Sequence, residues 1–155
     1  MTWGNQNSAE DAADQLSLAF DSGVNFIDTA EAYPIALSPE TSGATDRAIA
    51  KWFSLTKRPR DSVVISTKVC GYNDRYTWLR KSGEGTRLSK DQILESVDDS
   101  LGRLETDYID VLQLHWPDRP MSLTGTSTKV KLKDTAPHRP EHALLTPRST
   151  LLTPF

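Results

Sequence analysis

The chain has 155 residues, of which 37% are hydrophobic and 25% are charged, so we expect one soluble domain with a packed core. Its net charge of -3 argues against nucleic acid or an anionic membrane as the main partner. The single cysteine, Cys70, excludes an internal disulfide framework and a cysteine-rich zinc site, and the short apolar runs exclude a transmembrane helix. Polar residues closely follow Met1, so we expect no secretory signal and a cytoplasmic location.

Charge and composition change near residue 120. Residues 1–119 carry 19 acidic and 13 basic side chains, whereas residues 120–155 carry two acidic and five basic ones. The second segment also holds five of the nine prolines, so it cannot bury enough apolar surface to offset the entropy lost on ordering. We therefore predict a folded domain over residues 1–119 and a disordered Pro/Thr-rich tail over residues 120–155. The alternative for the tail is a docking or phosphorylation segment.

Helix and strand signals alternate through residues 1–119. Apolar residues at helical spacing indicate three helices, and β-branched or apolar runs indicate three strands. In chain order we expect a helix that begins at a Ser8–Asp11 capping box and ends at Gly23, a strand over residues 24–30, a helix around residues 48–53, a strand covered on both faces over residues 63–69, a polar loop over residues 71–88, a helix that begins at a Ser89–Gln92 capping box, and a strand over residues 109–115.

This alternation predicts a parallel α/β sheet, because crossover helices connect parallel strands. Residues 1–4 are interpreted as the remnant of an earlier strand. No strand is followed by a GxGxxG sequence, so a dinucleotide-binding Rossmann fold is not indicated. The sequence also has no Gly-x-Ser-x-Gly elbow, Walker loop or helical pair of metal-spaced histidines, so hydrolase, phosphate-handling and metal sites are disfavoured.

Ionisable side chains close the three predicted strands. Asp28 ends the first strand, Lys68 the second and His115 the third, and Tyr33 lies in the loop just after Asp28. The carboxyl ends of parallel strands share one face, where catalytic groups gather. Taken singly, each residue also has a structural explanation: a turn former, a lysine that snorkels to solvent, a satisfied core histidine and a turn-capping tyrosine.

Together these four side-chain types can deliver a proton to a carbonyl group. A tyrosine acts as a general acid near neutral pH only if its pKa of about 10 is lowered, and a nearby ammonium favours the phenolate. A buried ammonium needs a carboxylate to stay charged, and a neutral imidazole can polarise a carbonyl oxygen. The set therefore predicts proton delivery during the reduction of a carbonyl compound.

Longer motifs around these residues resemble a known family. The segments that resemble the aldo-keto reductases are residues 23–33 (GVNFIDTAEAY), 64–69 (VISTKV) and 101–117 (LGRLETDYIDVLQLHWP). The insert at residues 39–43 (PETSG) and the run at residues 115–120 (HWPDRP) are similar to the bacterial Tas-like branch of that family. The resemblance extends to about residue 120.

The resemblance implies the N-terminal half, strands one to four, of a (β/α)8 TIM barrel that reduces aldehydes or ketones with NADPH. It places Asp28 near the nicotinamide ribose and Gln6 at a position where related proteins touch the cofactor. The family's grip on the cofactor phosphate and adenine comes from segments after strands seven and eight, which residues 120–155 do not replace. Hydride would pass directly from the nicotinamide to a small carbonyl substrate, with no metal.

The resemblance also implies a role for each residue at the strand ends. Tyr33 matches the general acid, Lys68 the lysine that tunes it, and Asp28 the carboxylate that pairs with this lysine. His115 matches the residue that orients the substrate carbonyl. Trp78, in the loop over residues 71–88, is a candidate substrate contact.

A complete barrel of this kind needs about 250 residues, so we expect a half barrel here. Its sheet edges would be open at strands one and four, its inner face would be apolar and uncovered, and the strand interiors at residues 63–65 and 111–114 would lose partners. Open edges favour pairing with another chain, so we predict self-association and little activity of the chain alone. The alternative function is a non-enzymatic regulatory or interaction protein derived from the same barrel.

Overall fold

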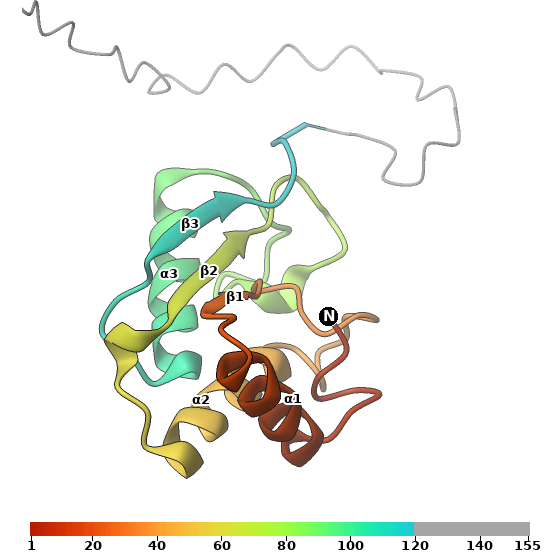
Figure 1. Ribbon diagram of the computed structural model, residues 1–155. Coiled ribbons are helices and arrows are strands. Elements are labelled where there is room, and N and C mark those ends of the chain that lie inside the picture. Colours follow the sequence, from red (N-terminus) through yellow and green to blue (C-terminus); the bar gives the residue numbers. More distant parts are fainter. Residues whose placement is uncertain (120–155) are drawn as a thin grey trace, which may run out of the picture. The chain divides into compact units, whose positions relative to one another are not determined.

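The computed structural model describes residues 1–119, in which helices and strands alternate (Figure 1). The elements are α1 (Ala9–Asp21), β1 (Phe26–Asp28), α2 (Ala44–Thr56), β2 (Val64–Val69), α3 (Lys90–Leu104) and β3 (Val111–Leu114), with short 3₁₀ turns at Arg60–Ser62 and Thr77–Leu79. Within this range no helix is long and apolar enough to cross a membrane. The predicted tail lies outside the described residues.

The strands form one parallel sheet in the order β1-β2-β3, which confirms the predicted α/β class. Asp28 of β1 is in register with Ser66 of β2, and Lys68 of β2 is in register with Gln113 of β3. In the helical layer α2 contacts both α1 and α3, and α3 contacts β2 (Figure 1). All three strands point the same way, so their carboxyl ends lie at one edge of the sheet.

Local sequence explains the limits of α1. The Ser8 hydroxyl accepts a hydrogen bond from the Asp11 backbone N–H at 3.0 Å, and the Asp11 carboxylate accepts one from the Ser8 N–H at 2.9 Å. This is the predicted capping box. Gly23 follows the last turn with a φ of 91°, a backbone conformation that favours glycine and ends the helix.

The second predicted capping box is only half formed. The Gln92 backbone N–H donates to the Ser89 hydroxyl at 3.4 Å, as predicted for the start of α3. The Gln92 side-chain oxygen does not accept a hydrogen bond from the Ser89 backbone N–H, because it accepts instead from Arg80 Nε at 3.0 Å and from the Arg87 N–H at 2.6 Å. Gln92 therefore ties the preceding loop to α3.

The main core lies between the sheet and the helices. Its central side chains come from alternate strand positions, which point into the helical layer, and from the apolar stripes of the helices. Its buried members are Ala13, Leu16, Ile27, Ile49, Trp52, Val63, Ile65 and Leu104. The apolar spacing in the sequence thus identifies the buried face of each helix.

The N-terminal residues differ from the prediction. Residues 1–4 do not form a strand: Trp3 makes an isolated bridge with Asn7, and Gly4 turns the chain with a φ of 87°. The backbone N–H groups of residues 5–7 all donate to the Thr2 carbonyl, so this segment closes on itself as a turn. The described sheet therefore has three strands, not the four expected.

The outer strands are shorter than predicted. β1 covers residues 26–28 of the expected 24–30, and β3 covers residues 111–114 of the expected 109–115. In the described part of the chain each of these strands pairs with β2 on one side only, whereas β2, which pairs on both sides, matches its prediction to within one residue. Pairing thus limits the length of the edge strands.

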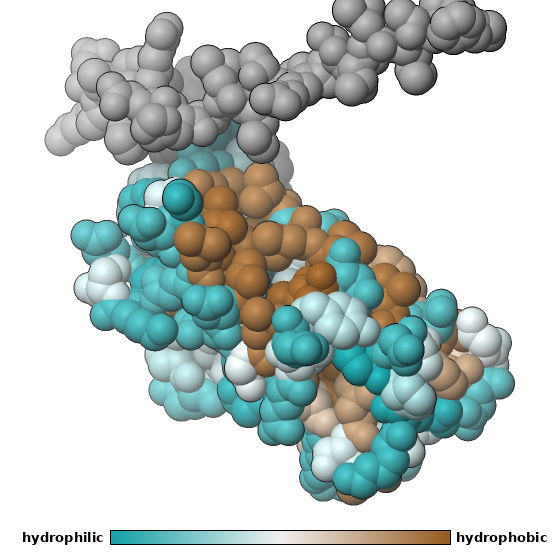
Figure 2. All heavy atoms as spheres, turned by 90° about the vertical axis from the view of Figure 1, so that its left-hand side faces the viewer, coloured by the Kyte–Doolittle hydropathy of each residue, from teal (hydrophilic) through white to brown (hydrophobic). Residues whose placement is uncertain are grey.

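The exposed apolar surface lies only partly where the sequence analysis placed it. Val63 and Ile65 are buried, so the expected loss of partners there is wrong, but Leu112 and Leu114 of β3 are 45% and 60% exposed. Because side chains alternate along a strand, these leucines lie on the opposite face from Gln113, which is on the inner face with Lys68. Viewed from the side of α3 and β3, apolar residues form a continuous band (Figure 2).

The inner face of the described sheet is apolar where the strands begin and polar toward their carboxyl ends, so the expectation of an apolar inner face holds only in part. This face carries Phe26, Val64 and Val111 at the amino ends of the strands, and Asp28, Ser66, Lys68 and Gln113 nearer the carboxyl ends. This face carries the candidate chemistry.

Replacing Ile65 by alanine tests the core. Ile65 is fully buried in the central strand, so we expect Ile65→Ala to lower the free energy of unfolding of the full chain by about 2–5 kcal/mol. Leu18→Ala, at an exposed position of α1, should change it by less than about 0.5 kcal/mol. Urea unfolding followed by far-UV circular dichroism measures both, and equal effects would contradict the assigned core.

Candidate active site

The structure brings the four predicted residues together at the carboxyl ends of the strands. Lys68 Nζ donates to Asp28 Oδ2 at 2.5 Å and to the Thr29 carbonyl at 2.8 Å. The same nitrogen lies 5.0 Å from the centre of the Tyr33 ring. The Tyr33 ring meets the His115 ring edge to face, with centroids 5.6 Å apart. Asp28, Lys68, Tyr33 and His115 therefore form a continuous chain of contacts, called the tetrad below.

Gln113 and Ser66 hold the tetrad carboxylate from the sheet. Gln113 Nε2 donates to Asp28 Oδ1 at 3.3 Å and to the Ser66 hydroxyl at 2.6 Å. The sequence analysis missed both residues. The signal that could have found them is strand alternation, since Ser66 lies two positions before Lys68 and Gln113 two before His115, on the same face.

A second buried network supports the backbone that holds Lys68. The Thr29 hydroxyl donates to Asp46 Oδ1 at 2.7 Å, and Arg103 Nε donates to Asp46 Oδ2 at 2.9 Å. Burial raises the pKa of Asp46 despite the nearby Arg103 charge. The Thr29 carbonyl that accepts from Lys68 is thereby fixed by α2 and α3 together.

His115 lies in surroundings that favour a neutral imidazole. Burial, and then the positive charge of Lys68, lower the pKa of His115 from its usual 6.5. Its backbone N–H donates to the Val69 carbonyl at 2.8 Å, and its ring packs against Trp116 with centroids 4.7 Å apart. Nδ1 is buried without a hydrogen-bond partner among residues 1–119. A neutral ring at this position can donate one N–H hydrogen bond to the oxygen of a bound carbonyl compound.

Gln6 and Trp78 lie outside the tetrad's direct contacts. Gln6 is exposed in the N-terminal turn, which touches the loop after Tyr33 because the Ile35 N–H donates to the Met1 carbonyl at 2.8 Å. Trp78 is partly exposed in the second 3₁₀ turn.

Trp78 is the outer end of a row of aromatic rings that begins at the tetrad. Its ring is 5.6 Å from that of Tyr76, which is 6.4 Å from that of Trp116, the neighbour of His115. Trp116 is oriented by donation from its Nε1 to the Tyr72 carbonyl at 3.0 Å. We call Tyr76, Trp78 and Trp116 the aromatic row; it leads from the tetrad into the loop over residues 71–88.

The sequence analysis also missed a buried ion pair beside the tetrad. Glu31 and Arg80 are 2% and 3% exposed, and two guanidinium nitrogens of Arg80 donate to the Glu31 carboxylate at 2.9 and 3.0 Å. Burial alone raises the pKa of Glu31, but donation from Arg80, Ser96 and the Cys70 N–H outweighs it, so the pKa lies below its usual value. In the sequence Glu31 and Arg80 both look like ordinary loop residues, and only the fold shows that they form an ion pair.

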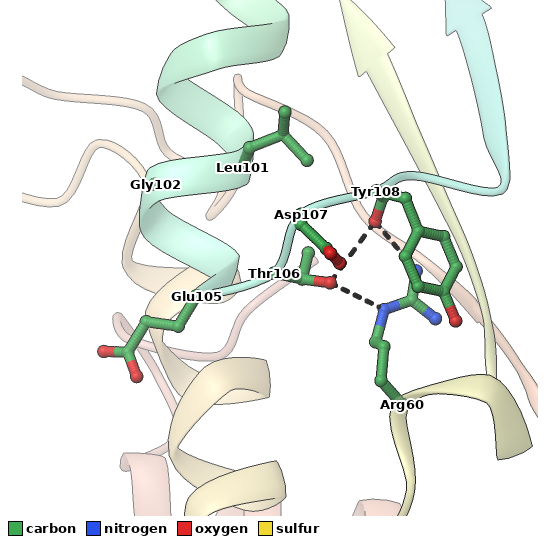
Figure 3. Close-up of a pocket in the computed structure, with 7 residues that line it drawn as sticks. All are labelled: Arg60, Leu101, Gly102, Glu105, Thr106, Asp107 and Tyr108. Atoms are coloured by element: carbon green, nitrogen blue, oxygen red, sulfur yellow. Dashed lines mark hydrogen bonds between the residues drawn. The ribbon is translucent and has the colours of Figure 1, made fainter.

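A hollow on the described part of the chain lies away from the tetrad. It is lined by Arg60 and by residues of the segment that joins α3 to β3, including Thr106 and Tyr108, as Figure 3 shows. Arg60 stacks on the Tyr108 ring at 4.1 Å and donates to Thr106 and to the Tyr108 carbonyl, so its polar groups are already satisfied (Figure 3). These residues precede β2 and β3, so the hollow lies at the amino ends of the strands, opposite the tetrad. Nowhere in residues 1–119 do three His, Cys, Asp or Glu side chains gather as metal ligands.

Comparison with known proteins identifies the family of this chain. The chain matches the model of the aldo/keto reductase family over residues 1–138. It is 40% identical over 129 residues to protein tas of Escherichia coli, covering 81% of this chain and 35% of that protein. It is 36% identical over 126 residues to a probable voltage-gated potassium channel subunit beta of Arabidopsis thaliana, covering 81% of this chain and 34% of that protein. The chain therefore belongs to the aldo/keto reductase family.

A solved structure carries the fold comparison. An aldo-keto reductase from Klebsiella pneumoniae in complex with NADPH superposes with a TM-score of 0.55 at 25% identity, covering 77% of this chain and 34% of that one. The chain thus spans about a third of the length of the relatives it matches. The family match extends past residue 119, and the domain boundary at that residue stays a prediction.

Histidine protonation gives a test of the site. The unfolded chain binds a proton at His115 near pH 6.5, whereas the folded chain binds it only at lower pH. The free energy of unfolding should therefore fall as the pH decreases below about 6.5, because the unfolded state then holds more protons. Urea unfolding from pH 7.5 to 5 should show a steeper fall for the unaltered chain than for His115→Gln. Parallel curves would contradict the buried, neutral imidazole.

Proposed function

We propose that this chain carries the proton-delivering site of an NADPH-dependent aldo-keto reductase, which reduces aldehydes or ketones to alcohols. The observation that supports this most directly is the unbroken line of contacts from Asp28 through Lys68 and Tyr33 to His115. The site belongs to the same edge of the sheet at which parallel α/β proteins gather catalytic groups.

The tetrad side chains have distinct parts in the proposed reaction. NADPH, when bound, supplies a hydride to the carbonyl carbon. Tyr33 gives its phenolic proton to the carbonyl oxygen as negative charge develops there. The ammonium of Lys68 stabilises the phenolate that remains, and Asp28 holds that ammonium in place. The neutral imidazole of His115 orients the carbonyl oxygen toward Tyr33.

The described residues fit the nicotinamide end of the cofactor. Asp28 forms an ion pair with Lys68, but 46% of its side chain stays exposed. Its carboxylate can therefore still accept a hydrogen bond from a ribose hydroxyl. Gln6 is exposed on the turn that contacts the loop after Tyr33 and would add an amide contact. The family's contacts to the cofactor phosphate and adenine belong to later segments of a full barrel.

Removing the phenolic proton tests the assigned acid. We expect Tyr33→Phe to lower NADPH-dependent reduction of a small aldehyde by at least about a hundredfold, since no other side chain in the tetrad can replace this donor. Tyr108→Phe is the matched control, because Tyr108 lies at the opposite end of the sheet. The measurement is the absorbance of NADPH at saturating aldehyde, with circular dichroism to confirm folding. Activity that survives Tyr33→Phe would show that the assignment is wrong.

Trp78, the outer member of the aromatic row, is proposed to contact the substrate. We expect Trp78→Ala to raise KM for an aromatic aldehyde by about three- to tenfold while kcat changes little, because an aromatic contact contributes about 0.5–1.5 kcal/mol to binding. Trp78→Phe keeps a ring and should restore most of the affinity. An unchanged KM in Trp78→Ala would remove this residue from the substrate site.

A second candidate function is a non-enzymatic interaction protein built on the same fold. Two observations favour it: the exposed apolar residues of β3, and the similarity to a relative named as a probable potassium channel subunit beta. Titration with NADPH, followed by protein fluorescence, separates the candidates. A folded chain that neither binds NADPH nor reduces aldehydes would favour the interaction protein, and sedimentation velocity would then show whether it self-associates.

A further inference from the structure

We propose that Glu31, acting through Arg80, is the positioning residue that holds the loop over residues 71–88 and its aromatic row against the tetrad. This inference rests on the proposed function in one respect, since that loop is where the substrate is proposed to bind. Glu31 does not touch the tetrad side chains, so its role is to place them rather than to react.

Glu31 is bonded on every side to a different part of the chain. Its Oε1 accepts from the Cys70 backbone N–H at 2.6 Å, just beyond the end of β2, and its Oε2 accepts from the Ser96 hydroxyl of α3 at 2.7 Å. Its own backbone N–H donates to the Lys68 carbonyl at 3.2 Å. One carboxylate thereby fixes the loop that carries Tyr33, the end of the strand that carries Lys68, and a helix of the outer layer.

Arg80 extends this fixed point into the substrate loop. Its guanidinium side chain has no exposed surface, and its nitrogens bind Glu31 through two parallel bonds and the Gln92 side chain through a third. Two parallel bonds fix orientation as well as distance, which a lysine could not do. Arg80 is thus a rigid link between the loop and the residues next to the tetrad.

The aromatic row packs on residues next to this link. Leu79, adjacent to Arg80, is buried against Ala32 and Cys70, and Tyr76 and Trp116 pack on the same cluster. Ala32 directly follows Glu31 in the chain, and Cys70 directly follows Val69. The apolar cluster and the ion pair are therefore built on the same backbone segments. Releasing Arg80 would free the loop segment that carries Tyr76 and Trp78.

The geometry makes loss of either partner consequential. A buried guanidinium without its carboxylate is an uncompensated charge, so the loop that carries Arg80 would move outward to hydrate it. Such a movement is local, because the main core around Ile65 and Trp52 is a separate cluster. The expected defect is a loosened substrate loop on an intact domain.

Hydrogen exchange by mass spectrometry on the full chain tests the proposal. Glu31→Gln keeps the shape of the side chain and removes its charge, and we expect exchange in peptides from residues 71–88 to accelerate at least about tenfold, with peptides from α1 unchanged. Arg80→Lys should give the same pattern, because it keeps the charge but loses the two parallel bonds. Unchanged loop exchange, or equal acceleration throughout the domain, would overturn the proposal.

Asp110→Asn is the matched control. Asp110 also accepts from an arginine, Arg60, at 2.7 Å and from a backbone N–H, that of Ile65, at 2.8 Å, but at the opposite end of the sheet. This variant should loosen the start of β3 and leave residues 71–88 as they are. Accelerated exchange of residues 71–88 in Asp110→Asn would mean that loss of any ion pair loosens this loop, which would contradict a specific role of Glu31.

The ring-proton NMR signals of His115 report tetrad geometry, since Tyr33 and Trp116 both lie within ring-current range. These signals should move in Glu31→Gln and stay in place in Asp110→Asn, and a Glu31→Gln spectrum identical to that of the unaltered chain would contradict the positioning role.

Should Glu31→Gln fail to fold, Ser96→Ala removes one donor to Glu31 and leaves the ion pair intact. It should accelerate exchange of the same loop peptides by a smaller factor, and a folded Ser96→Ala without this effect would overturn the proposal. None of these readouts needs turnover. NADPH-dependent reduction that is as fast in Tyr33→Phe as in the unaltered chain would therefore overturn the proposed function while the loop result remains readable.

Discussion

The buried ion pair between Glu31 and Arg80 is the constraint on which the active face of this domain depends. Removing one member of such a pair commonly costs about 3–5 kcal/mol, because the other charge is left without compensation in a low-dielectric interior. A well-packed apolar pair could provide similar stability. An apolar pair could not, however, bond to the Cys70 N–H, the Ser96 hydroxyl and the Gln92 amide at the same time. The ion pair therefore serves to fix three segments in one arrangement.

The tetrad uses the same principle at the edge of the sheet. Lys68 Nζ lies near the Tyr33 ring, and it is held there by Asp28 and by a carbonyl whose position Asp46 controls from α2. Parallel strands supply the close approach of these residues without any special backbone, since register alone aligns Lys68 with Gln113 and Asp28 with Ser66. Chemistry at this edge follows from strand order and from the carboxylates behind it.

Local signals in the sequence predicted the helices, the central strand and the tetrad. Each depends on residues close together in the chain: the Ser8 cap, the β-branched run of β2, and an ionisable residue at or next to each strand end. The partnership of Glu31 with Arg80 could not be predicted, because the two residues are 49 positions apart and neither lies in a periodic pattern.

Two further differences between prediction and structure share a physical cause. A strand needs a neighbour, and with β2 as their only partner among residues 1–119, β1 and β3 are short, while residues 1–4 close into a turn. Whether the side chains of β3 are covered depends on what packs against this strand, so the alternation of Leu112, Gln113 and Leu114 does not decide it. Such properties belong to tertiary contacts and not to the segment itself.

Because Cys70 is buried next to Glu31, its thiol can report local opening of this part of the structure. It is the chain's single thiol, it is fully buried, and its backbone N–H is held by Glu31. Burial, reinforced by the adjacent Glu31 charge, raises the pKa of this thiol, so the reactive thiolate does not form while the surrounding structure is closed. A thiol reagent would therefore label the folded chain only during the moments when the Glu31 junction comes apart, and the labelling rate would measure how often it does.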